Sequence, residues 1–449
     1  MNVVIIGIGP HFRRTYMQYL DKYQIYPKLL VELESERKNV QDLIKEKKWK
    51  NTIIFTILDK YKNVEILPQK YETLLNKICE EKSITHAIIA TEPKGHLMYL
   101  NFFLKKGIHT LTDKPLICFD NMLNLDNVKR LQTTYKQLLK DSNNVVCKIL
   151  CQRNYHRGYE YVRELVKQII KRYNIPITYI SVYSCDGNWV FPHDLDYENH
   201  PYKYGYGKMF HSGYHFIDLL VSLLKLNKYV SDEKRITKAK MFNCFVTPQD
   251  ESDIISLFDY RNFFKNEIFP SYYDKQYFNY EEYGEKDVFT KLELLNNNNR
   301  IITIADLNIL ESGFSRRGWL HTKDDRYKGN GRVRHESINI QLGPLLNIQI
   351  HSYQSKEIKD RCSMGECDFG GLDHFDIDIY RNIDIIGGKP YERIRSNEIY
   401  DFSNENHFVG LNELGRMEAI SAFFSLQNDE NDLKNHKDSV DFQLASQEE

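Results

Sequence analysis

The feature that most constrains the fold is an alternation of short apolar runs with amphipathic stretches along residues 1–150. Short apolar runs predict buried strands, and strands that alternate with helical stretches indicate a parallel, doubly wound sheet. We therefore expect an α/β domain over residues 1–150. Its predicted strands are Val3–Ile6, Lys28–Val31, Thr52–Leu58, His86–Ala90, His109–Leu111 and Val145–Cys151.

The pattern changes after residue 150. Longer strands follow in which apolar and polar residues alternate, which predicts a large, mostly antiparallel sheet with one solvated face. Asn296 to Asn299 and Gly343-Pro344 lie between such strands and predict two hairpins. We expect an α+β substrate and oligomerisation domain over residues 151–425, expanded at about 227–335. The polar residues 426–449 predict a disordered tail.

Charge and hydropathy exclude several classes of function. The chain has 61 basic and 62 acidic residues and a formal charge of -1, so no overall field attracts it to nucleic acid or to a membrane. No uncharged run approaches the ~20 residues of a membrane span, and the N-terminus does not resemble a signal peptide. We expect a cytoplasmic protein that acts on a small molecule and has no nucleic-acid or membrane partner.

The first predicted strand runs directly into G-I-G-P-H-F. Gly7 permits a tight turn, Gly9 lets the backbone approach a pyrophosphate, and the following helix would offer its N–H groups to that anion. This order is typical of a Rossmann dinucleotide-binding domain, although Phe12 stands where the third glycine would be. Pro10, His11 and Phe12 complete the predicted turn.

An acidic residue at the end of the second strand can bind the adenosine ribose of such a cofactor. Glu34 lies there, and Glu32 is the alternative if the strand ends earlier. A carboxylate repels a 2′-phosphate, so we expect NAD, while the nearby Arg37 and Lys38 leave NADP open. Both glutamates could instead be solvated strand-end charges.

Three stretches follow the glycine turn along the chain, A-T-E-P-K-G-H from Ala90, T-D-K-P-L from Thr112 and H-S-G-Y-H-F-I-D from His211, and Q-R-N-Y-H-R-G-Y from Gln152 lies between the last two. Together with the glycine turn, these segments resemble the glucose-fructose oxidoreductase and inositol dehydrogenase family (Gfo/Idh/MocA). The resemblance covers roughly residues 1–220 and extends loosely beyond, while residues 227–335 depart from it. It implies a cofactor site that includes Thr91, Pro93, His96, Asp113 and Lys114.

By the same resemblance, Lys114 would polarise the substrate oxygen and His215 would be the general base. A neutral imidazole has a suitable pKa for this task, and an ammonium favours a developing alkoxide. The family has an aspartate where this chain has His211. Either two histidines relay the proton, or the redox step is altered or lost. Arg153, Tyr155, His211 and Asp218 are further candidates for substrate binding.

Other interpretations compete with these assignments. His211, His215 and Asp218 could hold zinc, but the spacing lacks the glutamate of H-E-x-x-H, so we expect no metal. The aromatic segment around Trp189 suits a sugar-like ring or is an ordinary polar loop. Basic residues that suit a phosphate, or form a solvated face, are Arg316, Arg317, Lys328, Arg332 and Arg334.

The sequence thus predicts an NAD(P)-dependent dehydrogenase or reductase acting on CH-OH groups of a sugar, cyclitol or sugar-phosphate-like molecule. We expect a homo-oligomer formed through the open sheet. The alternatives are a dinucleotide-binding sensor or scaffold without turnover and, less favoured, a zinc-dependent hydrolase.

Overall fold

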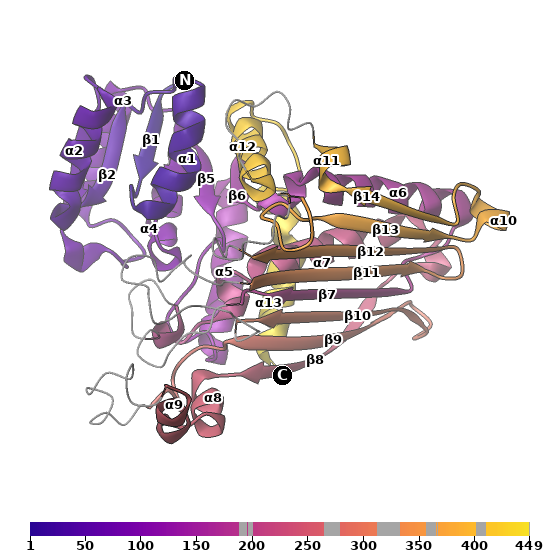
Figure 1. Cartoon of the computed structure of the whole chain (residues 1–449). Helices are drawn as coiled ribbons and strands as arrows, with labels where there is room; N and C mark the ends of the chain where they lie inside the picture. Colours follow the sequence, from indigo (N-terminus) through magenta and orange to yellow (C-terminus); the bar gives the residue numbers. More distant parts are fainter. Residues whose placement is uncertain are drawn as a thin grey trace. The chain divides into compact units, whose positions relative to one another are not determined.

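The computed structural model describes residues 1–187, 195, 201–264, 279–311, 333–355, 365, 367–400 and 410–448. The chain divides into two compact units, whose elements are labelled in Figure 1. Unit 1 comprises Met1–Asp120, Asp126–His156 and Leu411–Asp441. Unit 2 comprises Asn121–Leu125, Arg157–Gly410 and Phe442–Glu449. Unit 1 therefore extends past the boundary expected after residue 150 and takes in a C-terminal segment.

Unit 1 contains the predicted doubly wound parallel sheet. Its six strands have the order β3-β2-β1-β4-β5-β6, and every neighbouring pair is parallel. β1 lies at the centre, where Ile5 is in register with Leu30 of β2 and Ile88 of β4. The strands are β1 Val3–Ile6, β2 Leu29–Leu33, β3 Ile53–Ile57, β4 His86–Ile89, β5 His109–Asp113 and β6 Cys147–Leu150.

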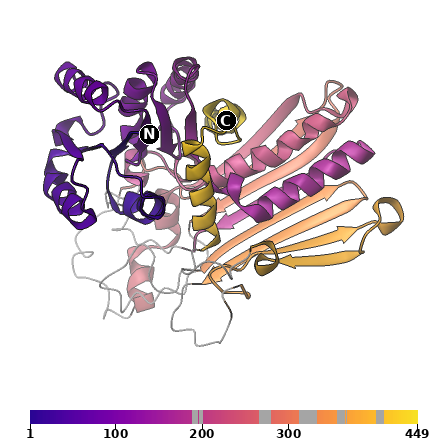
Figure 2. The ribbon, with the colours of Figure 1, turned by 90° about the horizontal axis from the view of Figure 1, so that it is seen from above.

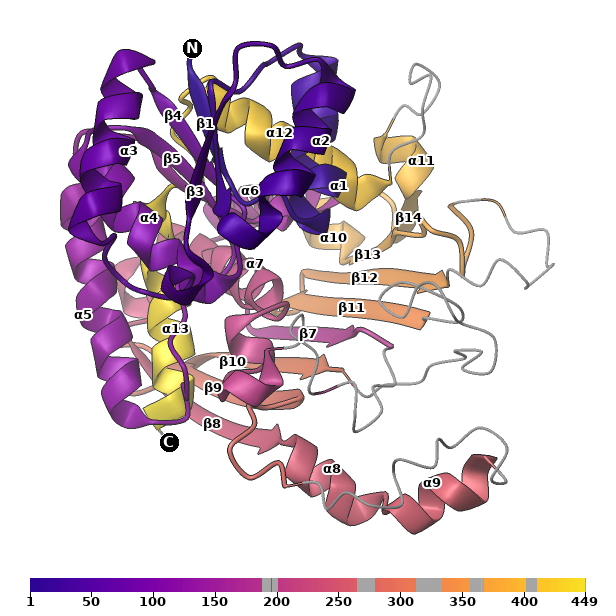
Figure 3. The same cartoon turned by 90° about the vertical axis from the view of Figure 1, so that its left-hand side faces the viewer.

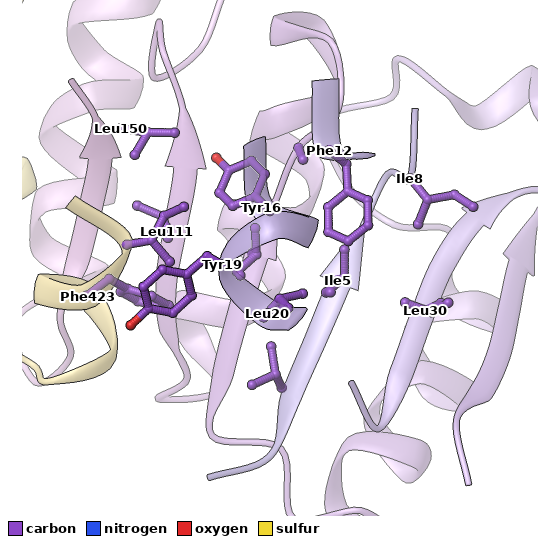
Figure 4. Close-up of a cluster of buried hydrophobic side chains, with 14 of the residues drawn as sticks. Ile5, Ile8, Phe12, Tyr16, Tyr19, Leu20, Leu30, Leu111, Leu150 and Phe423 are labelled. Carbon is purple, nitrogen blue, oxygen red and sulfur yellow. The ribbon is translucent and has the colours of Figure 1, made fainter. Parts of the chain in front are cut away.

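Helices cover both faces of this sheet (Figure 3). On one face, Phe12 and Tyr16 of α1 pack with Phe423 of α12 against apolar side chains of the strands such as Ile5 and Leu111 (Figure 4). Burying each large apolar side chain contributes about 1.5–3 kcal/mol. The helices of this face are α1 Pro10–Lys22, α2 Arg37–Lys47 and α12 Leu411–Phe424; those of the other are α3 Gln69–Glu81, α4 Pro93–Lys105 and α5 Leu125–Asp141.

Unit 2 contains the predicted larger sheet. Its eight strands have the order β14-β13-β12-β11-β7-β10-β9-β8, and all pairs are antiparallel except β7 with β10. Both predicted hairpins are present, β9–β10 and β11–β12, the second turning at Gly343 with φ +48°. The strands are β7 Tyr179–Cys185, β8 Lys238–Val246, β9 Asp287–Leu295, β10 Ile301–Leu310, β11 Val333–Leu342, β12 Leu346–Ser355, β13 Asp376–Arg381 and β14 Tyr391–Arg395.

One face of this sheet is apolar and the other is polar. α6 (Arg157–Tyr173) and α7 (Tyr214–Leu224) lie along the apolar face, as Figure 2 shows. The polar face carries side chains such as Asn347, whose Nδ2 donates to Asn339 Oδ1 at 2.8 Å. The remaining helices of unit 2 are α8 Pro248–Ile254, α9 Leu257–Phe264, α10 Ile383–Ile386 and α11 Ser396–Ile399. In the part of the chain that the structure describes, no helix is long and apolar enough to cross a membrane.

The prediction of a disordered tail was wrong. After residue 426 the chain forms a 3₁₀ turn, Leu433–His436, and the helix α13, Lys437–Glu448. The fully buried Lys148 of β6 explains the order, because its Nζ lies 2.6 Å from Asp429 Oδ2 and 2.8 Å from Asp432 Oδ1. Tail carboxylates that appear solvated from composition thus neutralise a buried ammonium of the parallel sheet.

Replacing Lys148 should strongly destabilise unit 1. Lys148→Met leaves two largely buried carboxylates without their cation, which typically costs 3–5 kcal/mol of unfolding free energy. Urea denaturation measures this change. Lys434 is the control, because its Nζ is 4.0 Å from Asp432 and its side chain is 65% exposed. Lys434→Met should cost at most about 1 kcal/mol. Equal losses in both variants would contradict a special role for Lys148.

Candidate functional site

The turn between β1 and α1 has the geometry of an anion site. Gly7 has φ +83°, and a Cβ there would lie 2.9 Å from the carbonyl oxygen of Ala90. Gly9 caps α1, and a Cβ there would meet nothing within 4 Å. Pro10 follows as the first helical residue. The fold thus requires the first glycine, while the second leaves open space before a helix N-terminus that favours anions.

Glu32 supports this turn from β2. Its Oε1 accepts a hydrogen bond from the Ile8 N–H at 2.8 Å, and its Oε2 accepts one from the Leu33 N–H at 2.7 Å. Burial raises the pKa of Glu32 above its ordinary value. Both oxygens are engaged by the main chain, so Glu32 positions the turn and is a poor candidate for a ribose ligand.

Glu34 follows the end of β2, where a ribose ligand is expected, but it has a partner. Arg37 Nε and Nη2 donate to its two oxygens at 2.7 and 2.9 Å, and the Thr56 hydroxyl also donates to it. These bonds, above all those from Arg37, lower the pKa of Glu34 to about 2. The strand end therefore presents an ionised carboxylate and a guanidinium together.

His11 and Asp113 join the glycine turn to the end of β5. His11 Nε2 lies 3.1 Å from Asp113 Oδ2, and the Tyr16 hydroxyl donates to Asp113 Oδ1 at 2.7 Å. Burial alone would raise the pKa of Asp113, but His11 and these hydrogen bonds hold it below its usual range. Phe12, the last residue of the predicted turn, is fully buried in the core of unit 1, and its place in the cofactor site stays a prediction.

His96 lies between main-chain carbonyl groups. Its side chain is fully buried in α4, with Nε2 3.0 Å from the carbonyl oxygen of Thr91 and Nδ1 3.0 Å from that of Leu116. Burial lowers the pKa of His96. It therefore links the turn after β4, which leads through Pro93 into α4, to the segment after β5 that contains the half-buried Lys114. This structural link is what the contacts of His96 show, and its place in the cofactor site stays a prediction.

In unit 2 the two histidines occupy different environments. His211 is half-buried in the turn before α7, whereas His215 and Asp218 are buried within α7. Among the described residues, neither histidine belongs to a group of three ligand atoms close enough to share a metal ion. The geometry of the pair therefore does not favour the zinc interpretation.

Sequence reasoning missed a buried carboxyl beside this turn. Glu285 accepts a hydrogen bond from the Met209 N–H at 2.8 Å, two residues before His211. Burial raises the pKa of Glu285 to about 7. No local pattern marks it, because it precedes an ordinary strand, β9. It places a group that titrates near neutrality next to the histidine turn.

The structure gives the surroundings of some other predicted substrate residues, whose role stays a prediction. In unit 1, Arg153 is buried, and Tyr155 is half-buried with its hydroxyl donating to Asp429. Arg334 Nε lies 3.9 Å from Asp186 Oδ1 in unit 2. The described residues do not include the rest of these candidates, which are Trp189, Arg316, Arg317, Lys328 and Arg332.

Known structures share this fold of a six-stranded parallel sheet and a second, mostly antiparallel sheet. No protein-family model and no curated protein sequence matches the chain. Similar solved structures include a super-repressor mutant of Gal80p from Saccharomyces cerevisiae, with a TM-score of 0.55, 13% identity and coverage of 100% of this chain and 96% of that chain. An oxidoreductase domain protein from Kribbella flavida has a TM-score of 0.54, 11% identity and the same coverage. UDP-N-acetylglucosamine 3-dehydrogenase from Acidithiobacillus ferrooxidans has a TM-score of 0.51 and 11% identity, again with 100% and 96% coverage. At these identities the likeness shows the fold alone.

The two glycines should respond differently to the same substitution. Gly9→Ala adds a methyl group to open space, so stability should be unchanged while the affinity for a dinucleotide falls at least about tenfold, or ~1.4 kcal/mol. Gly7→Ala should also lower the melting temperature, because an alanine is strained at the positive φ of this position and its Cβ would clash with the carbonyl oxygen of Ala90. Thermal unfolding and nucleotide titration of both variants check this. Unchanged nucleotide binding by Gly9→Ala would contradict the assignment of this turn.

Proposed function

We propose that the chain is an NAD(P)-dependent oxidoreductase of the Gfo/Idh/MocA type. It would transfer a hydride between the cofactor and a hydroxyl or carbonyl carbon of a sugar, cyclitol or sugar phosphate. The observation that carries the proposal is the glycine turn, in which Gly9 leaves room at the start of α1 while Gly7 and Glu32 fix the backbone around it. Unit 2 would form a homo-oligomer through its polar sheet face.

The residues of unit 1 fit a dinucleotide. The N–H groups at the start of α1 would bind the pyrophosphate, and Glu34 would accept hydrogen bonds from the adenosine ribose. A bound nicotinamide would supply the hydride acceptor or donor. Lys114 would donate a hydrogen bond to the reacting oxygen, and His215 would hold the proton that leaves or returns to it. The name of the Acidithiobacillus structure, a dehydrogenase of a nucleotide sugar, is consistent with a sugar-like substrate.

Cofactor choice should depend on Glu34 and Arg37. The ionised Glu34 repels a 2′-phosphate, so NADH should bind more tightly than NADPH in fluorescence titrations. Glu34→Gln removes this charge and weakens the hydrogen bonds to Arg37, whose guanidinium can then bind a 2′-phosphate. The ratio of NADPH to NADH affinity should therefore rise about tenfold, ~1.4 kcal/mol. Glu36→Gln, at a half-buried acid two residues on whose carboxylate accepts from Asn39, is the control and should change little. Binding of neither nucleotide would contradict the oxidoreductase proposal, and a strong NADPH preference of the wild type would contradict the role of Glu34.

Lys114 and His215 should matter for turnover and not for nucleotide binding. Lys114→Ala and His215→Ala should each lower turnover of a cognate substrate ~10²-fold or more while NADH affinity stays near the wild-type value. Steady-state kinetics beside nucleotide titration measures both quantities, with the exposed Lys106→Ala as control. Wild-type kinetic constants in Lys114→Ala would place the chemistry elsewhere.

A dinucleotide-binding sensor without turnover is the second candidate. His211 favours it, because a neutral imidazole cannot stabilise a charged His215 as the family's aspartate would. The likeness to a super-repressor form of Gal80p gives it a precedent within the fold. A wild type that binds NADH but oxidises no polyol or sugar, and gains activity in His211→Asp, would favour the sensor.

A further inference from the structure

A second buried lysine holds the turn that carries His211. Lys208 belongs to the 3₁₀ turn Lys208–Phe210, and its side chain is 1% exposed. Its Nζ binds the carboxylates of Asp186 and Glu311 and lies 3.1 Å from Ser212 Oγ. Asp186 follows β7, and Glu311 follows β10. One ammonium thus ties two strand ends to the histidine turn.

The main chain of Lys208 is equally engaged. Its carbonyl oxygen accepts hydrogen bonds from the N–H groups of His211 at 3.3 Å and Gly213 at 2.9 Å, and its own N–H donates to Glu285 O at 3.0 Å. A Cβ on Gly213 would lie 2.5 Å from that carbonyl oxygen, so the turn is closed tightly. Gly213 caps α7, and His215 follows two residues later. The position of Lys208 therefore determines where α7 begins.

The charged and titratable groups around Lys208 come from several elements. Glu285 precedes β9, Arg334 of β11 approaches Asp186, and the Tyr202 hydroxyl bonds to Glu311. Burial alone would lower the pKa of Lys208, but Asp186 and Glu311 raise it above its ordinary value. The ammonium is therefore a fixed positive charge across the pH range in which histidines titrate.

We propose that Lys208 is a positioning residue for the histidine pair, which holds the turn from Lys208 to Gly213 against the ends of β7 and β10 and so sets the orientation and ionisation of His211 and His215. The catalytic consequence rests on the proposed function. The positioning itself can be measured without turnover.

The test is a pH titration of the His211 and His215 ring signals by NMR, assigned with His211→Asn and His215→Asn. Lys208→Met leaves Asp186 and Glu311 without their cation, so both histidine midpoints should rise by about half a pH unit or more. Lys208→Arg keeps the charge and should stay near the wild type. Lys286→Met is the matched control, since Lys286 is also 1% exposed and pairs with Glu251 in the same unit; it should leave both midpoints unchanged.

Glu311→Gln is a second variant for the case in which Lys208→Met does not fold. It keeps the side-chain volume and removes one negative charge, so the pH midpoints of both histidines should fall.

Unchanged midpoints in Glu311→Gln and in folded Lys208→Met would overturn the proposal, as would an equal shift in Lys286→Met. Shifted midpoints in a protein that binds no dinucleotide would keep the positioning role and remove the proposed function. Normal turnover with unshifted midpoints would keep the proposed function and remove the positioning role of Lys208.

Discussion

The close approach of Gly7 to the carbonyl of Ala90 sets the arrangement of unit 1 around its candidate site. Only a residue without a side chain can adopt φ +83° there and let the turn after β1 lie against the end of β4. Glu32 then fixes the next N–H of the same turn from β2, and His11 reaches Asp113 at the end of β5. Polar contacts thus join the carboxyl ends of neighbouring parallel strands, which is where ligands bind in open α/β sheets.

Buried lysines paired with carboxylates recur in both units. Lys148 in unit 1 and Lys208 in unit 2 each bind two carboxylates, and Lys286 binds Glu251. A buried cation is tolerated only with such partners, and removing one member of the pair leaves the other charge buried and uncompensated. In unit 1 the pairing orders the C-terminal segment. In unit 2 it orders the turn before α7, which contains His211 and leads into the helix that carries His215.

The sequence predicted what depends on neighbouring residues. Apolar runs marked the six parallel strands, Asn296 to Asn299 and Gly343 marked the hairpins, and Gly7 and Gly9 marked the turn. It did not predict contacts between distant residues. Lys148 pairs with Asp432, 284 positions away, so the charged tail appeared solvated. A lysine inside the apolar run Val145–Cys151 was the available sign of a buried partner. Nor could a motif show that His96 is buried between main-chain carbonyl groups, or that both carboxylate oxygens of Glu32 accept from the main chain.

The central claim is that the glycine turn binds the pyrophosphate of a nicotinamide dinucleotide. A crystal structure of the chain grown with NADH tests it most directly. The account predicts density for the pyrophosphate beside Gly9, within hydrogen-bond distance of the first N–H groups of α1, with the adenosine ribose at Glu34. NADH bound elsewhere, or a turn left without nucleotide at saturating NADH, would contradict it.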